Sequence, residues 1–169
     1  MAGVAWHLFA KAHFNPFTNR IAPQRTLAPV QHIEAEEREA TENHDACFMR
    51  METKGVLYNG AAAHVAGDDD TGACSGSATY TFNLVSAVRA AAIQMRYSDA
   101  AGGDGYEFSI DGKVAGDGVS STTASWQTFT TSKPIAVGDL APGVHTLKVR
   151  ITDARTRGMT IDAFDVGGQ

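Results

Sequence analysis

An acidic run, Asp68–Asp70, followed by Thr71 and Gly72, carries the residues most suggestive of chemistry. Asp70, Thr71 and Gly72 spell the triplet of aspartic proteases, in which two copies meet so that two aspartates share one proton. The chain holds one copy, and two further aspartates precede it. We therefore do not expect a protease, and the run is more typical of a solvated loop.

Other catalytic and metal-binding patterns give still less. The segment GACSG is not the G-x-S-x-G nucleophile motif. The six histidines show no H-E-x-x-H spacing, and no C-x-x-C pair exists. Cys47 and Cys74 are the only cysteines. They could form one disulfide in an oxidising compartment or remain as small buried thiols.

Composition narrows the choice of partners. The 169 residues are 43% hydrophobic, which is enough for a domain core. The net charge of −5 and the pI near 5.6 argue against a nucleic acid or an anionic membrane as partner. No run approaches the ~18 apolar residues of a membrane helix. The opening residues lack the basic region and the cleavage site of a signal peptide.

Three segments in the middle of the chain alternate between apolar and polar residues. Their apolar members are Tyr80, Phe82 and Leu84, then Ile93, Met95 and Tyr97, then Tyr106, Phe108 and Ile110. Side chains of a strand alternate between its two faces, so each segment has one apolar face that a second layer must cover. Turn signals separate further short strands. We predict an all-β fold, a two-sheet antiparallel β-sandwich.

The flanking segments set the domain boundary. Residues 1–31 hold three of the five prolines, which favours a linker or a surface strap from a longer parent chain. Residues 32–169 are predicted to form the sandwich. Residues 32–45 have the propensity of a helix, but as a strand they would turn Ile33 and Ala35 inward.

Later segments are predicted from the same signals. The segment TASWQTF is predicted to be an alternating strand through Trp126 and Phe129. Pro142–Gly143 is predicted to be a turn that leads into a strand with Leu147, Val149 and Ile151 facing the core.

These motifs together resemble carbohydrate-binding modules of families 6 and 35. In order, the motifs are IEAE, YTF, QMRYSD, FSIDG, SWQTF, LAPGVHTLKV and TIDAFDV. The resemblance covers about residues 32–167. It implies a jelly roll of the galactose-binding-domain-like type that binds polysaccharide without cleaving it. It also implies secretion and fusion to a glycan-degrading enzyme, and it favours a strand over a helix for IEAE.

The resemblance further implies a structural calcium ion held by Glu34, Glu36 and Asp162. Carboxylates two residues apart on a strand lie on one face, about 7 Å apart. A hard cation between them would offset their repulsion and join the first strand to the last. The alternative is a solvated acidic face without metal.

Sugar recognition in these families uses aromatic rings, because the C–H face of a pyranose stacks on them. Trp126 matches the tryptophan at the edge of the families' binding loop, although a tryptophan in an alternating strand can also be buried in the core. The weaker candidates for the rim of the site are Tyr58, His64, Asp69, Asp70 and Thr160. The acidic run Asp68–Asp70 could instead hold a second calcium ion.

Two departures from the family 6 pattern leave the ligand class open. The region where family 6 has a second aromatic residue holds His64, and Thr160 stands where family 6 has an asparagine. The sequence does not say which glycan is bound.

Two other classes of function remain as alternatives. A β-sandwich glycoside hydrolase or polysaccharide lyase would need paired carboxylates, for which Glu34 and Glu36 have the spacing. Glu107 and Asp111 lie on the polar face of a predicted strand, an ordinary place for solvated acids. A protein-binding adhesion domain is the third class. We expect a monomer whose partner is a polysaccharide or oligosaccharide.

Overall fold

The computed structural model describes residues 27–37, 40–44, 48–52, 62–66, 74–154 and 158–168. All regular elements in these ranges are strands. The strand prediction for IEAE is confirmed as far as Glu34, and Ala35 and Glu36 form the turn that follows. Ile33 and Ala35 are buried, as predicted. No helix in the described ranges is long and apolar enough to cross a membrane.

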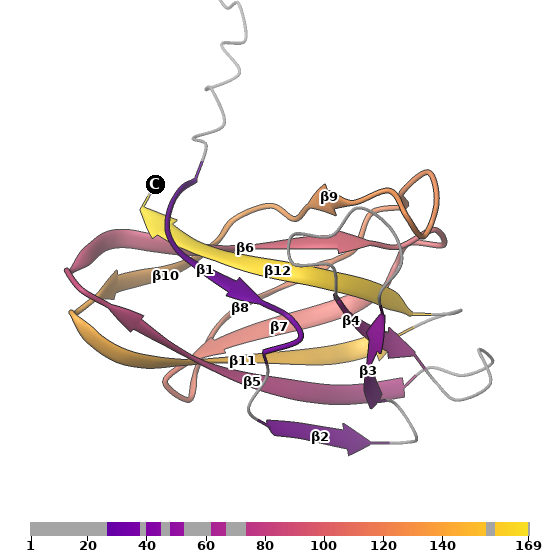
Figure 1. The fold of residues 1–169 in the computed structure, drawn as a ribbon, viewed down its shortest axis with the longest axis horizontal. Helices are drawn as coiled ribbons and strands as arrows, with labels where there is room; N and C mark the ends of the chain where they lie inside the picture. Colours follow the sequence, from indigo (N-terminus) through magenta and orange to yellow (C-terminus); the bar gives the residue numbers. More distant parts are fainter. Residues whose placement is uncertain are drawn as a thin grey trace, which may run out of the picture.

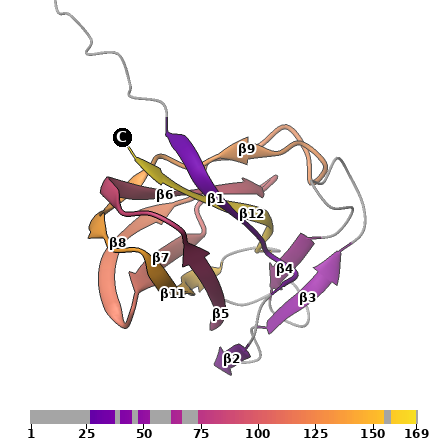
Figure 2. The same cartoon turned by 60° about the vertical axis from the view of Figure 1, so that its left-hand side comes forward.

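Two antiparallel sheets face each other, which confirms the predicted sandwich (Figures 1 and 2). The first sheet contains β1 (Ala28–Glu34), β3 (Phe48–Glu52), β4 (Ala62–Ala66), β6 (Val88–Ser98), β9 (Thr130–Thr131), β10 (Ile135–Leu140) and β12 (Met159–Gly168). The second contains β2 (Ala40–His44), β5 (Cys74–Leu84), β7 (Gly105–Ile110), β8 (Lys113–Val119) and β11 (Gly143–Ala154).

The strand orders show how the chain crosses between the layers. The first sheet runs β10-β6-β12-β4-β3, with β1 beside β12 and β9 beside β6. The second runs β2-β5-β11-β7-β8. The three alternating segments are therefore not neighbours in one sheet, because β5 and β7 lie in the second sheet and β6 lies in the first. This division lets all three apolar faces meet in one core.

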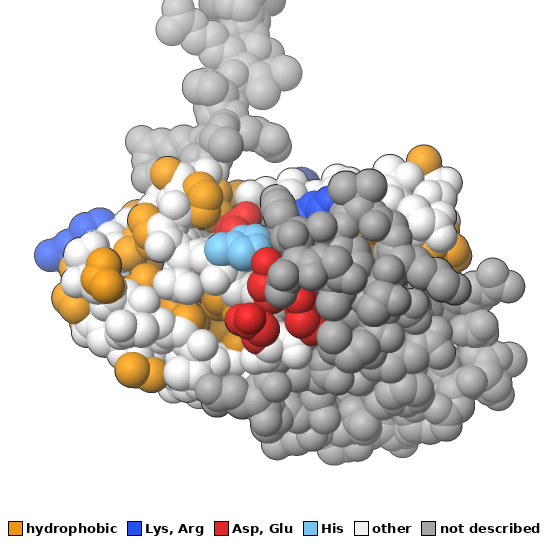
Figure 3. Space-filling view, viewed as in Figure 1, with side chains coloured by type: hydrophobic (Ala, Val, Ile, Leu, Met, Phe, Trp, Pro, Cys, Tyr) orange, Lys and Arg blue, Asp and Glu red, His pale blue; other side chains and the backbone are white. Residues whose placement is uncertain are grey.

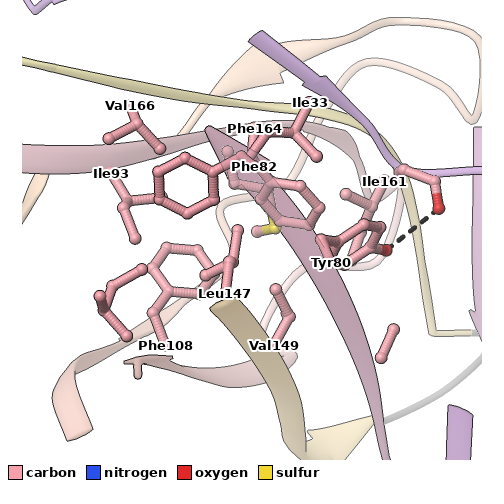
Figure 4. Packing of buried hydrophobic residues seen from close by; sticks show 14 of the residues in the cluster. Ile33, Tyr80, Phe82, Ile93, Phe108, Leu147, Val149, Ile161, Phe164 and Val166 are labelled. Carbon is pink, nitrogen blue, oxygen red and sulfur yellow. Dashed lines mark hydrogen bonds between the residues drawn. The ribbon is translucent and has the colours of Figure 1, made fainter. Parts of the chain in front are cut away.

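That core is formed by the predicted inward residues. The nine apolar members of the three alternating segments are all buried, and so are Leu147, Val149 and Ile151 of β11. Phe164 of β12 lies among the rings of the opposite sheet, 5.1 Å from Tyr80 and 6.0 Å from Phe108 between ring centroids (Figure 4). The Tyr80 hydroxyl is buried too, and it donates a 3.0 Å hydrogen bond to the Ala35 carbonyl.

The first and last strands lie side by side. β1 pairs with β12 from Ala28, opposite Gly168, to Glu34, opposite Ala163 (Figure 1). The predicted domain start at residue 32 thus falls inside β1, because four earlier residues already belong to the sheet. Residues 1–26 lie outside the described ranges.

Candidate functional site

The end of β1 meets β12 at the three acidic residues predicted to hold calcium. Glu34 ends the strand, and Glu36 lies in the turn that follows. The Ala35 amide donates a 3.0 Å hydrogen bond to the Asp162 carbonyl, which holds this turn against β12. We call Glu34, Glu36 and Asp162 the acidic junction.

A β-bulge places Asp162 in this junction. Ile161 pairs with Tyr97 and Ala163 pairs with Arg96, so Asp162 is an extra residue between two paired ones. A bulge of this kind changes the direction of side chains along the strand. The Asp162 side chain is fully buried and forms an ion pair with Nη1 of Arg96. Arg96 was not among the residues that the sequence singled out.

The acids of the junction act on one another electrostatically. Burial is the largest cause that raises the pKa of Glu34, and the charges of Glu36 and Asp162 raise it further, against a lowering effect of His32. Glu34 Oε2 is buried without a hydrogen-bond partner, and one carboxylate oxygen of Glu36 is also shut off from solvent. Asp162 is therefore a neighbour of Glu34 and Glu36, although it lies far from both in the sequence.

His32 borders the junction on the solvent side. Its Nδ1 lies 2.7 Å from Asp165 Oδ1, and its Nε2 lies 3.2 Å from Glu34 Oε1. Burial alone would lower the pKa of His32, but the carboxylates of Asp165 and Glu34 outweigh it and raise that pKa. Figure 3 shows acidic side chains gathered around a histidine on the face where β1 runs beside β12.

The donor set suits a hard cation, because it consists of carboxylate oxygens that repel one another and are partly withdrawn from water. Within the described ranges, however, no three His, Cys, Asp or Glu side chains already stand as a metal-binding group. Arg96 takes up one oxygen of Asp162. The calcium ligands therefore stay a prediction.

Trp126 lies in a turn, so the predicted strand through TASWQTF is wrong. We call residues 120–129, between β8 and β9, the Trp126 loop. Ser125 organises its turn: the Ser125 carbonyl accepts the Thr128 amide at 3.1 Å, and Ser125 Oγ accepts the Gln127 amide at 3.2 Å. Serine at the start of a turn can bond its own backbone in this way. Trp126 is half-buried and is not a member of the described hydrophobic core cluster.

Thr160 and the backbone of His64 lie in the same row of the first sheet as Ser98, which binds this loop. Ser98 Oγ donates a 2.9 Å hydrogen bond to the Trp126 carbonyl. Ser98 pairs with Thr160 across β6 and β12, and Thr160 pairs with His64 across β12 and β4. Two of the predicted ligand-binding positions, Thr160 and His64, thus lie in one row of the first sheet with Ser98, whose side chain holds the Trp126 backbone.

The remaining sequence candidates are placed as follows. Tyr58, Asp69 and Asp70 lie outside the described residues, as do Asp68 and Cys47. Glu107 accepts two hydrogen bonds from the Arg150 guanidinium, each with a nitrogen-to-oxygen distance of 3.2 Å. Asp111 accepts the Thr146 amide at 2.9 Å and contacts His145.

The sandwich can now be compared with known proteins. No protein-family model matches the chain, and no curated protein matches its sequence. A family 6 module of the lichenase 5A from Cellvibrio mixtus, solved with cellotriose, matches with a TM-score of 0.57 and 20% identity over 83% of this chain and 98% of that chain. A family 35 module from Clostridium thermocellum matches with a TM-score of 0.57 and 18% identity over 82% and 98%. The fold is that of the family 6 and family 35 carbohydrate-binding modules.

A longer protein contains the same sandwich. A cycloisomaltooligosaccharide glucanotransferase from Paenibacillus sp., complexed with cycloisomaltoheptaose, matches with a TM-score of 0.59 and 15% identity. The match covers 80% of this chain but 18% of that chain. At these identities the likeness to family 6 and family 35 modules establishes the fold, and the ligand has to be argued from the site.

Proposed function

We propose that this chain binds polysaccharide without cleaving it and that Trp126 stacks on a sugar ring. The observation that carries this is the presentation of Trp126 on a turn, half-buried, with its backbone fixed to β6 by Ser98. A ring held in this way offers an apolar face while its position is already set, which lowers the entropy lost on binding. Thr160 and His64 are rim candidates from the same row of the sheet.

A catalytic role has less support. Glu107 faces Arg150 and Asp111 faces His145, so both acids take part in pairs on the second sheet. The acidic junction holds three carboxylates, but their crowding suits a cation better than the separate acid and base roles of a glycosidase. Tyr58, Asp69 and Asp70 remain proposed contacts of the ligand, and a second calcium ion at Asp68–Asp70 remains an alternative.

We also propose a structural calcium ion at the acidic junction. Glu34, Glu36 and Asp162 would hold it through their carboxylates. When bound, the ion would supply positive charge between groups that repel one another and would join the turn after β1 to β12. The support is the buried Glu34 oxygen and the raised pKa of that residue.

The setting that we propose is a secreted glycan-degrading enzyme, with the residues before β1 as the connector. Two observations favour this setting. A similar sandwich occurs inside the much longer glucanotransferase chain. The start of β1 and the end of β12 lie together, so a catalytic domain could be attached at either end of the sandwich.

A panel of immobilised polysaccharides, with cellotriose as the first soluble probe, tests the function. We expect retention on at least one polysaccharide without release of reducing sugar. Release would indicate an enzyme, and neither retention nor release would favour an adhesion domain. Repeating the panel in chelator shows whether a metal ion takes part in binding.

The variant Trp126→Ala tests the site on the polysaccharide that is retained. We expect binding to weaken by about 1–3 kcal/mol, as for a central aromatic contact, with a nearly unchanged thermal midpoint. Calorimetric titration measures the first quantity and thermal denaturation the second. Val85→Ala, at a 92% exposed residue between β5 and β6, is the matched control. Unchanged affinity in Trp126→Ala would place the binding site elsewhere.

A further inference from the structure

The outward face of β6 is covered by another part of the chain. Ile93, Met95 and Tyr97 point into the core, so alternation turns Gln94, Arg96 and Ser98 to the other side. Period two identifies this face as polar but does not say which residues contact it. Each of its three residues contacts the segment 126–132, which comprises the end of the Trp126 loop, β9 and Ser132.

The two outer contacts are hydrogen bonds to the backbone of that segment. Gln94 Nε2 donates to the Ser132 carbonyl at 2.7 Å, and Ser98 Oγ donates to the Trp126 carbonyl at 2.9 Å. Backbone pairing of Arg96 with Thr131 lies between them. The segment 126–132 thus runs beside β6, with β9 paired to it in the same sheet, and side chains of β6 hold the segment at both ends of the contact.

Arg96 is the middle residue of this face, and it has two partners at once. Its guanidinium carbon lies 4.5 Å from the centroid of the Phe129 ring, and its Nη1 forms an ion pair with Asp162. A planar guanidinium can stack on an aromatic ring with its face while it donates hydrogen bonds in its own plane. The buried Asp162 carboxylate therefore holds the Arg96 guanidinium, and the Phe129 ring of the Trp126 loop packs on that guanidinium.

The other end of the loop is fixed independently. Asp99 is fully buried and accepts a hydrogen bond from Ser120 Oγ, and its carbonyl accepts the Thr123 amide at 2.7 Å. The loop is therefore anchored before Trp126 by Asp99 and after Trp126 by the Arg96–Phe129 contact.

We propose that Arg96 is a positioning residue of the binding loop, which links the buried Asp162 carboxylate to the placement of Trp126 through Phe129. This inference rests on the proposed function, because it assigns Phe129 and Arg96 to the support of the sugar-binding ring. It predicts that the loop loses order when the guanidinium, the ring or the Asp162 charge is removed.

The first test needs no carbohydrate. In a Trp6→Phe background, Trp126 is the only tryptophan, and acrylamide quenching of its fluorescence reports the exposure of the loop. We expect Arg96→Gln and Phe129→Leu each to increase the quenching constant, and Arg96→Lys, which keeps the charge, to restore part of the protection. Arg89→Gln is the matched control, because Arg89 lies on the same strand in an exposed pair with Asp139. Quenching that is unchanged in both Arg96→Gln and Phe129→Leu would overturn the proposal.

The second test measures affinity for the retained polysaccharide in chelator, so that no metal ion contributes. We expect Arg96→Gln and Phe129→Leu each to weaken binding about 2- to 30-fold, the range of one cation–π contact. The double variant should lose little more than either single variant, because both remove the same contact. Additive losses would contradict the inference. If Arg96→Gln does not fold, Phe129→Leu alone decides, since it leaves the ion pair with Asp162 intact.

The two tests separate this inference from the proposed function. If the wild-type chain binds no polysaccharide, the proposed function fails, and the quenching series still decides whether Arg96 orders the loop. If the wild-type chain binds polysaccharide but Arg96→Gln and Phe129→Leu change neither the quenching constant nor the affinity, the proposed function stands and the positioning role of Arg96 is wrong.

Discussion

His145 lies on the wall of the sandwich with both ring nitrogens close to oxygen atoms. Its Nε2 is 2.8 Å from the Ala141 carbonyl, and its Nδ1 is 2.8 Å from Asp111 Oδ2. The Ala141 carbonyl, followed by the Asp111 carboxylate, raises the pKa of His145 against the effect of burial. Burial alone would raise the pKa of Asp111, but the Thr146 amide and His145 outweigh it and lower that pKa.

This pair predicts a pH dependence of stability. A raised histidine pKa stabilises the fold fully below the ordinary value of 6.5, and this contribution is lost as the pH rises through the raised value. A lowered aspartate pKa stabilises above 3.8 and is lost as the pH falls through the lowered value. The pair should therefore contribute most between about pH 4 and 6.5.

Urea unfolding between pH 5 and 8 measures the histidine side of this window. We expect the difference in unfolding free energy between wild type and His145→Gln to shrink as the pH rises. A difference that stays constant over this range would show that protonation of His145 does not contribute. The subtraction also removes the effects of other histidines, which are present in both proteins.

The acidic junction predicts an effect of calcium on stability. If the ion binds there, calcium should raise the thermal midpoint, since it binds the folded chain and not the unfolded one. The unfolding free energy should increase by about 2.7 kcal/mol at a hundredfold excess of calcium over its dissociation constant. Glu34→Gln should abolish this rise. In chelator it should leave stability equal or higher, because it removes a buried charge and its repulsion with Glu36 and Asp162, which together outweigh the lost contact with His32. Calorimetry with calcium and with chelator measures both effects.

Glu107→Gln is the control for that experiment, because it removes one acid of the same type from the second sheet, where Glu107 faces Arg150. The calcium-dependent rise should survive in it. A rise of equal size in Glu34→Gln would place the ion elsewhere, and no rise in wild type would contradict the metal assignment.

At the scale of elements, the connection from β6 to β7 packs tightly against the Trp126 loop. Gly102 has a φ of +72°, and a Cβ there would lie 2.8 Å from the backbone nitrogen of Thr122. Gly112, in the β7–β8 hairpin, also has a positive φ of +77°, but a Cβ there would meet nothing within 4 Å. Comparing alanine substitutions at the two glycines therefore distinguishes the cost of backbone strain from the cost of steric contact.

We expect Gly112→Ala to lower the unfolding free energy by about 1 kcal/mol and Gly102→Ala to lower it by more, since positive φ alone costs about 1–3 kcal/mol. Denaturant titration gives both values. Equal losses would mean that the Thr122 backbone moves aside freely. Gly102→Ala should also increase the quenching of Trp126 in the Trp6→Phe background, whereas Gly112→Ala should not.

Alternation predicted the elements well where a strand has a core on one side and open surface on the other. Tyr80, Phe82 and Leu84 are such a case, and their burial follows from period two. The method failed at Trp126 and Phe129, because apolar residues separated by polar ones in a serine-organised turn imitate the same period. It also gave Arg96 no role, since period two identifies a polar face without saying which residues contact it.

At the scale of the whole molecule, sequence predicted the sandwich but not the division of strands between its sheets. Each alternating segment reveals one apolar face, and three such faces can meet from one layer or from two. The convergence of Glu34 and Glu36 with Asp162 came from the family resemblance, because no local pattern links residues so far apart. The bulge that isolates Asp162 has no signal in the sequence, since it depends on the register of β12 against β6.

Because Ala28 pairs with Gly168, the two ends of the described sandwich lie side by side. Domains whose two ends lie close together tolerate insertion into a surface loop of another domain.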